Sequence, residues 1–179
     1  MPNPKKAIVR LLGITVALCS LLMTMAGQTP QTPLASKFTS KDGRFSVKLP
    51  AEPTTKSEDI SSDNGPSTLH TFTVEINGGR SFFLIGYSDY NTSLDVAKTL
   101  DGVISAQAIG MKGKITSDKT VALKGYSGRS VTLETEDTIF YSTVYVAGSR
   151  LYQLMFGKPK EDPMPPEAKE FFDSFEILS

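Results

Sequence analysis

The segment that most constrains the fold is a run of four consecutive apolar residues, Phe82 to Ile85, near the middle of the chain. Side chains of an extended strand point alternately to opposite faces, so a strand with one solvated face alternates apolar and polar residues. An unbroken apolar run is instead typical of an interior strand that is covered on both faces. The chain must therefore supply a cover for each face of a sheet.

A first strand is predicted upstream of this run, at residues 45–49, where Pro50 ends an alternating pattern. Its apolar side chains are expected in the core: Phe45, Val47 and Leu49. The Lys-Asp-Gly-Arg segment before it should form the turn that leads into the strand.

A hairpin is predicted next, because Asn64-Gly65 supplies the positive φ angles of a tight reversal between two extended segments, residues 54–60 and 68–76. Three side chains of the second segment are expected to face the core: Phe72, Val74 and Ile76. A second reversal at residues 77–79 leads into the apolar run.

An amphipathic helix is predicted at residues 92–110, where apolar residues recur at helical spacing. Thr92 and Asp95 resemble a capping box at its start, and Gly110 is a natural stop. Gly102 lies inside this helix, where glycine costs about 1 kcal/mol relative to alanine. We expect that Gly102 allows the helix to approach the sheet closely.

The remaining chain predicts an antiparallel meander followed by a second helix. Extended segments joined by short reversals lie at residues 115–123, 127–134, 138–147 and 150–156. The final helix would begin at Pro165 or Pro166. Its apolar stripe is formed by Ala168, Phe171, Phe172 and Phe175. These elements predict an α+β fold in which helices pack against an antiparallel sheet.

Residues 1–27 follow the plan of a secretory signal peptide: three basic residues, an uncharged apolar run at residues 11–25, and a small pair, Ala26-Gly27. Cleavage is expected at Ala26 or Gly27, which would make the protein periplasmic or extracellular. The alternative is an uncleaved membrane anchor, although the apolar run is shorter than the ~20 residues that a bilayer requires.

The repeated Gln-Thr-Pro at residues 28–37 predicts an extended spacer, and a single domain is expected at residues 38–179. Cys19, the only cysteine, follows Leu18 in the leader, which argues against lipidation. Loss of the leader excludes disulfides and thiol catalysis. It also leaves 16 Lys and Arg against 19 Asp and Glu, a net charge of about −3 that argues against nucleic acid as a partner.

Metal and cofactor sites find little support in the residue pattern. His70 is the only histidine, and one imidazole without a thiolate cannot complete a usual zinc site, so a structural or rim position is expected. The acidic group Glu58, Asp59 and Asp63 does not match the spacing of a calcium loop and is expected at a solvated hairpin tip. No cofactor or metal is expected.

Hydrolase chemistry finds no complete motif. Ser127 lies in Gly-Tyr-Ser-Gly-Arg, where Gly128 comes one residue too early for a nucleophile elbow, and the two glycines are expected to allow a turn. Glu134, Glu136 and Asp137 lie at a predicted bend, where solvent exposure is expected, whereas catalytic carboxylates belong in clefts. A hydrolase would need at least two of four groups within hydrogen-bond reach: His70, Ser127, Glu134 and Asp137. It is the least favoured class.

Tyrosine is the residue type most suited to an interface here, because its side chain combines apolar area with a polar tip. Core or edge positions are nevertheless favoured for most of the six tyrosines. The candidate interaction surface comprises Tyr87, Tyr90, Tyr126 and Arg129.

Several stretches taken together resemble the PsbP-like fold family, which includes extrinsic proteins of photosystem II and bacterial envelope proteins. They are KDGRFSVKLPAEP (41–53), ALKGYSGRSVTL (122–133), FYSTVYVAGSRLYQLMFG (140–157) and EAKEFFDSFEIL (167–178). The resemblance covers residues 38–178 and rests on the order and spacing of elements. It implies an α/β/α sandwich with a central antiparallel sheet and two main helices, used mostly as a non-catalytic binding or assembly module.

The sequence therefore predicts an exported, non-enzymatic binding or assembly domain that acts at the cell envelope through a protein partner. Membrane contact is expected only through an uncleaved leader. The alternative is a carrier of a small apolar ligand, with a pocket between the sheet and the helix at residues 92–110. Neither the partner nor the oligomeric state follows from the residues.

Overall fold

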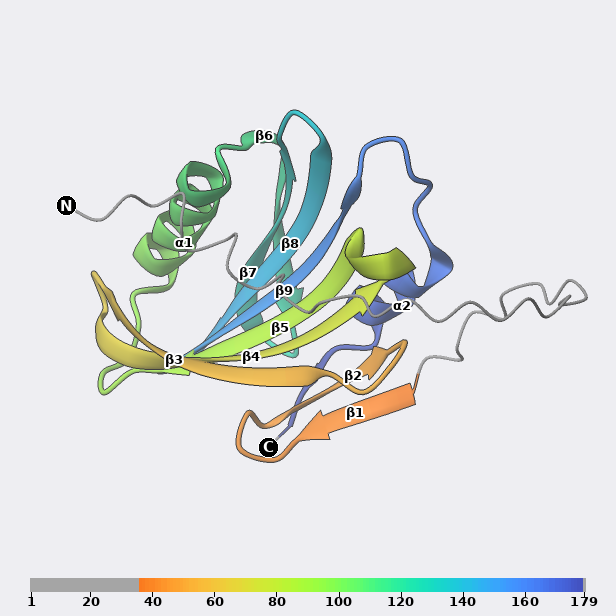
Figure 1. The fold of residues 1–179 in the computed structure, drawn as a ribbon. Coiled ribbons are helices and arrows are strands. Elements are labelled where there is room, and N and C mark those ends of the chain that lie inside the picture. Colours follow the sequence, from red (N-terminus) through yellow and green to blue (C-terminus); the bar gives the residue numbers. More distant parts are fainter. Residues whose placement is uncertain (1–35, 179) are drawn as a thin grey trace, which may run out of the picture. The chain divides into compact units, whose positions relative to one another are not determined.

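A computed structural model describes residues 36–178, which form two antiparallel sheets and two α-helices (Figure 1). The predicted α+β class, with two helices and a large antiparallel sheet, is confirmed. The predicted leader and residues 28–35 of the predicted spacer lie outside the described residues. Within residues 36–178, no helix has the length and hydropathy needed to cross a membrane.

The smaller sheet has three strands in the order β1 (Ser36–Ser40), β2 (Phe45–Leu49) and β10 (Glu176–Ile177). β2 is the predicted first strand, with the predicted bounds. β1 precedes it, begins inside the predicted spacer, and pairs Ser36 with Leu49 at the open end of the β1–β2 hairpin. β1 therefore begins two residues before residue 38, the predicted start of the domain.

The larger sheet has seven strands, and every neighbouring pair is antiparallel. Their spatial order is β3 (Thr54–Ser62), β4 (Gly65–Ile76), β5 (Ser81–Asp89), β9 (Arg150–Pro159), β8 (Thr138–Ala147), β7 (Tyr126–Glu134) and β6 (Lys114–Leu123). The predicted hairpin and meander are both present. A 3₁₀ turn, η2 (Asn77–Gly79), forms the reversal before β5.

The apolar run lies in β5, an interior strand of the larger sheet. Phe83 and Ile85 are fully buried on one face, whereas Phe82 and Leu84 on the other face are half-buried. The prediction of cover on both faces therefore holds fully for one face and partly for the other.

One face of the larger sheet packs against the smaller sheet and α2 (Pro166–Asp173). The first core on this face contains all three predicted side chains of β2, together with Phe72 and Val74 of β4. Phe171 of α2 lies 5.2 Å from Phe83, ring centre to ring centre. The predicted apolar stripe of α2 thus points into the core, and Phe175 extends it just beyond the helix end.

The opposite face carries α1 (Val96–Met111), which buries Leu100 and Ile104 in a second core with Leu133 of β7 and Val144 of β8. Figure 1 shows α1 and the smaller sheet on opposite sides of the larger sheet.

The ends of α1 differ from the prediction. Asp95, and not Thr92, caps the helix, because its carboxylate accepts a hydrogen bond from the Lys98 amide at 2.9 Å. The helix continues through Gly110 and ends at Met111, and its C-cap, Lys112, adopts a left-handed conformation with φ of 52°. The amide of Gly113 then donates to the carbonyl of Ala108 at 2.9 Å and closes the last turn.

Candidate functional site

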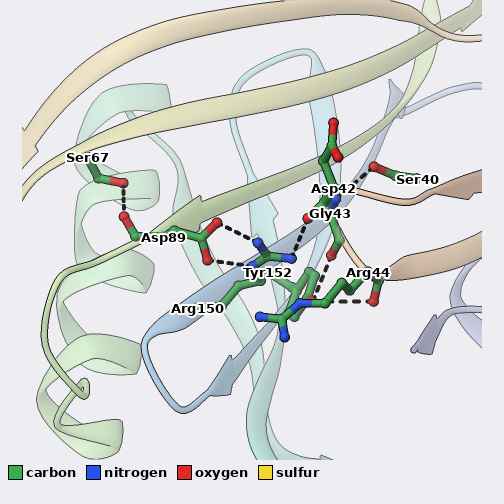
Figure 2. Close-up of polar contacts among 8 residues, drawn as sticks. All are labelled: Ser40, Asp42, Gly43, Arg44, Ser67, Asp89, Arg150 and Tyr152. Carbon is green, nitrogen blue, oxygen red and sulfur yellow. Dashed lines mark hydrogen bonds and ion pairs between the residues drawn. The ribbon is translucent and has the colours of Figure 1, made fainter. Parts of the chain in front are cut away.

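A buried cation, Arg150 of β9, holds the turn between β1 and β2 against the larger sheet (Figure 2). Its side chain is 8% exposed, and its Nε donates to the carboxylate of Asp89 at 2.6 Å, with a second bond from Nη2 to the same carboxylate. Nη1 donates to the backbone carbonyl of Asp42 at 2.9 Å. Burial alone would lower the pKa of Arg150, but Asp89 and Tyr152 together more than reverse this effect, so its pKa lies above the ordinary value.

Aromatic residues complete this anchor. The Arg150 guanidinium lies 4.7 Å from the ring centre of Tyr87, a cation–π contact. The hydroxyl of Tyr152 donates to the carbonyl of Gly43 at 2.8 Å, and the amide of Gly43 donates to Ser40 Oγ at 3.0 Å. Because these groups bind one another and the turn backbone, the cluster positions the turn and offers no free nucleophile or base.

A second buried cation performs a similar task near α2. Lys158 Nζ donates to the carbonyls of Pro159 at 3.1 Å and Asp162 at 2.7 Å. Both buried cations therefore anchor loops.

A cleft of about 420 Å³ lies beside α1 and is called the α1 cleft below. Its walls are residues 61–64 at the tip of the β3–β4 hairpin, Tyr90, and the side of α1 that faces this tip, from Lys98 to Ile109. Two contacts hold the hairpin tip in place: Ser62 Oγ to the Tyr90 hydroxyl, and Thr99 Oγ1 to Asn64 Oδ1, each at 3.4 Å.

The polarity of the α1 cleft changes along the helix. The first turn of α1 and the hairpin tip supply charged, hydroxyl and amide groups, whereas the later turns supply Gly102, Val103, Ala106 and Ile109, together with the hydroxyl of Ser105. Ile109 is 77% exposed, so the apolar end opens to solvent. The cleft therefore has one polar end and one apolar end.

The expectation that Gly102 allows a close approach to the sheet is wrong. Gly102 is exposed, and a Cβ atom at this position would meet no atom within 4 Å. Its missing side chain instead leaves open space over the second turn of the helix, inside the α1 cleft.

Two opposite charges line the polar end of the cleft, Lys98 on α1 and Asp63 on the hairpin tip. Neither belongs to an ion pair within 4.0 Å among the described residues. The cleft thus presents one cation and one anion that are open to a ligand.

Another groove, of about 510 Å³, lies between α2 and β2. Its charged side chains are already paired with one another: Lys37 with Glu176, Lys48 with Glu170, and Lys169 with Asp173. The α1 cleft is smaller, but its two charged side chains, unlike those of this groove, are not paired with each other.

The predicted interaction surface does not exist as one surface. Tyr87 and Tyr90 are buried, Tyr90 with its ring against the α1 cleft and Tyr87 under Arg150. Tyr126 is exposed, but three positions separate it from Arg129 on β7, so the two side chains point to opposite faces. The alternation of apolar and polar residues along the sequence could not show that Tyr87 and Tyr90 are buried.

Arg129 is occupied by an intramolecular task. It forms ion pairs with Asp118 of β6 and Asp101 of α1, and the hydrogen bond to Asp118 raises its pKa. The residue therefore pins α1 to the edge of the sheet.

The candidate hydrolase groups are scattered. Ser127 and Glu134 lie near opposite ends of β7, about 23 Å apart at ~3.3 Å per residue. Glu134 pairs with Lys160 at 3.7 Å, and the carbonyl of Asp137 accepts from the Lys160 amide. No hydrogen bond within residues 36–178 joins two of the predicted hydrolase groups.

The two glycines beside Ser127 serve different purposes. Gly125 has φ of 88° and occupies the β6–β7 turn, as predicted. Gly128 lies inside β7, where a Cβ atom would come within 2.4 Å of the Val144 carbonyl oxygen, so it permits close strand packing and not a turn.

One hydroxyl–imidazole pair was missed by the sequence interpretation. Ser57 Oγ lies 2.8 Å from His70 Nδ1, since the hairpin register places these residues opposite each other. His70 stacks on Tyr87, ring centres 4.7 Å apart, which fits the predicted rim position. Only the register of the hairpin could have revealed the pair.

The acidic residues of the hairpin are dispersed. Glu58 pairs with Lys56, and Asp59 accepts a hydrogen bond from Thr68 at 2.9 Å. No group of three or more His, Cys, Asp or Glu side chains in the described part of the chain is arranged to hold a metal ion.

Comparison with known proteins identifies no family. No protein-family model and no curated protein matches the chain. A crystal structure at 1.50 Å of a protein from Bacteroides thetaiotaomicron VPI-5482 is similar, with 16% identity and a TM-score of 0.45 over 81% of this chain and 49% of that chain. The chain thus spans about half the length of that protein, and a similarity at this level assigns neither family nor function.

Proposed function

We propose that the chain is an exported, non-enzymatic binding or assembly domain of the PsbP-like α/β/α type, which acts at the cell envelope through a protein partner. The observation that carries the proposal is the side of α1 that lines the cleft, where the apolar residues Ala106 and Ile109 are exposed to solvent. Ile109 at 77% exposure is the most prominent of them. Exposed apolar surface rimmed by polar groups is typical of interaction sites.

The walls of this site are held before any partner arrives. Arg129 fixes α1 through Asp101, and Asn64 of the hairpin tip contacts Thr99 of the helix. A preformed surface loses less conformational entropy on binding than a mobile one, so fixed walls favour a binding role.

The partner proposal is tested by capture from an envelope extract with a matched pair of variants. Ile109→Asp places a charge on the exposed side of α1, and Met164→Asp makes the same change at an exposed apolar residue outside the cleft. We expect a specific protein to be retained by the wild type and by Met164→Asp, and lost with Ile109→Asp. Repeated capture of no specific protein, or equal capture by Ile109→Asp, would count against the proposal.

Export is part of the same proposal. Amino-terminal sequencing of the protein from its host should begin at Gly27 or Gln28, as cleavage at Ala26 or Gly27 requires. A protein that retains Met1 in the membrane fraction would favour the anchor alternative.

A second candidate function is a carrier of a small ligand with an apolar part. The observation that favours it is the size of the α1 cleft, about 420 Å³, within the range of ~300–1,000 Å³ typical of small-molecule sites. Native mass spectrometry of protein from its own host should show a retained ligand. A measured mass equal to that of the protein without any ligand would count against this candidate.

A further inference from the structure

We infer that the α1 cleft binds a single-chain amphiphile with a zwitterionic head, the chemistry of an alkylphosphocholine or a lysophospholipid. The inference rests on the carrier form of the proposed function and names its ligand class.

The apolar end suits one extended chain. Gly102, Ala106 and Ile109 follow one another at intervals of four and three residues, so they share one side of α1. From Lys98 to Ile109 the helix rises by about 16 Å at ~1.5 Å per residue, so the cleft can be long as well as narrow. The volume of about 420 Å³ lies near the lower limit for small-molecule sites, which favours one chain over two.

The polar end suits a head with both charges. A purely anionic head that reached Lys98 would be repelled by Asp63, which lines the same end of the cleft. A purely cationic head that reached Asp63 would be repelled by Lys98. A zwitterion can pair its phosphate with Lys98 and its ammonium with Asp63. Hydroxyl and amide groups of Ser61 and Asn64 supply further hydrogen-bond partners.

The apolar half of the inference is tested with alkylphosphocholines of 8 to 14 carbons, by calorimetric titration of the full chain, as its host processes it, below the micellar concentration. We expect affinity to rise about fourfold per added methylene, which corresponds to the ~0.8 kcal/mol of burying one CH₂ group. The rise should stop once the chain extends past Ile109. A wild-type protein that binds none of the series saturably would overturn the inference.

Two glycine variants of α1 test where the chain lies. Gly102→Leu fills the cleft, while Gly110→Leu adds the same side chain to the same helix outside the cleft, and a Cβ meets no atom within 4 Å at either position. Both variants should keep or raise the melting temperature, because leucine favours a helix more than glycine does. We expect at least a tenfold loss of affinity for dodecylphosphocholine with Gly102→Leu and no change with Gly110→Leu. Equal binding by the two variants would place the ligand elsewhere.

Charge variants test the head. Asp63→Asn should weaken dodecylphosphocholine binding and strengthen dodecyl sulfate binding, whereas Lys98→Gln should weaken both. Wild-type protein that binds dodecyl maltoside and dodecyl sulfate as tightly as dodecylphosphocholine would overturn the assignment of a zwitterionic head. The partner proposal is decided separately by Ile109→Asp in the capture experiment, so each can fail without the other.

Discussion

Arg150 illustrates how one residue can position a turn that is distant in sequence. Its guanidinium binds the carbonyl of Asp42, 108 residues earlier in the chain, while Asp89 compensates its charge. A buried guanidinium needs such a partner, because an unpaired buried charge is costly. The pair therefore specifies how the smaller sheet meets the larger one.

Replacement of Arg150 by methionine should lower the free energy of unfolding by about 3 kcal/mol, the lower end for breaking a buried pair, because half of the Asp89 side chain is exposed and can be rehydrated. Urea denaturation measures the change. Arg80→Met is the control: Arg80 pairs with Glu161 and Asp162 at the surface, and its loss should cost no more than ~0.5 kcal/mol. Equal costs for the two variants would contradict the anchoring role.

Glu176 offers a prediction about pH. The hydroxyl of Ser46, followed by the ammonium of Lys37, lowers the pKa of the Glu176 carboxyl below its ordinary value. A lowered pKa means that folding favours the charged form, so this contribution is present above the ordinary pKa and is lost as pH falls through the lowered one. Carboxyl NMR titration should give a higher midpoint in Ser46→Ala than in the wild type. Identical midpoints would show that the hydroxyl has no such effect.

At the scale of a secondary-structure element, β2 is the strand on which the smaller sheet depends. Val47 is 1% exposed within the first core, so Val47→Asp buries a charge without a partner and should abolish cooperative unfolding. Val96→Asp is the matched control, since Val96 begins α1 at an exposed position where an acidic side chain favours the helix dipole. Thermal unfolding, monitored by circular dichroism, gives the melting temperature of each variant. An unchanged melting temperature in Val47→Asp would refute this placement.

Elements with strong periodicity or clear turn residues could be predicted from the sequence, and the weak ones could not. β2 and β8 match their predicted bounds because alternation and flanking turns coincide there. β1 carries one large apolar residue, Phe38, and β10 has two residues, so only pairing with β2 reveals either strand. The start of α1 was misplaced because Thr and Asp are both favoured N-cap residues, so residue type alone did not choose between Thr92 and Asp95.

At the scale of the whole molecule, the larger sheet is shared by two cores. In β9, Leu151 belongs to the second core under α1, whereas Tyr152 and Leu154 belong to the first core on the other face. Because alternate residues of one strand serve both cores, we expect the domain to unfold as one unit.

This expectation is tested with one truncation in each core. Ile104→Ala and Phe171→Ala should each cost roughly 2–5 kcal/mol, since both side chains are almost completely buried. Hydrogen exchange should show the most protected amides of α1 and α2 weakened by the same amount in either variant. Loss of protection confined to α1 in Ile104→Ala would show that the second core opens by itself.

Only the helix that borders the candidate site was foreseen. A pocket between the sheet and the helix at residues 92–110 was predicted, whereas the α1 cleft lies between that helix and the tip of the β3–β4 hairpin. The roles of Asp63 and Tyr90 depend on how far the β3–β4 hairpin reaches over α1, which no local pattern encodes. The same holds for Arg129, whose carboxylate partners lie 11 and 28 residues away.

The pairing of Ser36 with Leu49 gives the domain a direction of mechanical weakness. Both residues lie at the open end of the β1–β2 hairpin. A force applied at the amino-terminal end therefore breaks the hydrogen bonds between β1 and β2 one after another and not all at once. β1 would then peel away at low force while the seven-stranded sheet stays intact. If the chain is held by its amino-terminal segment, this hairpin becomes its first point of mechanical yield.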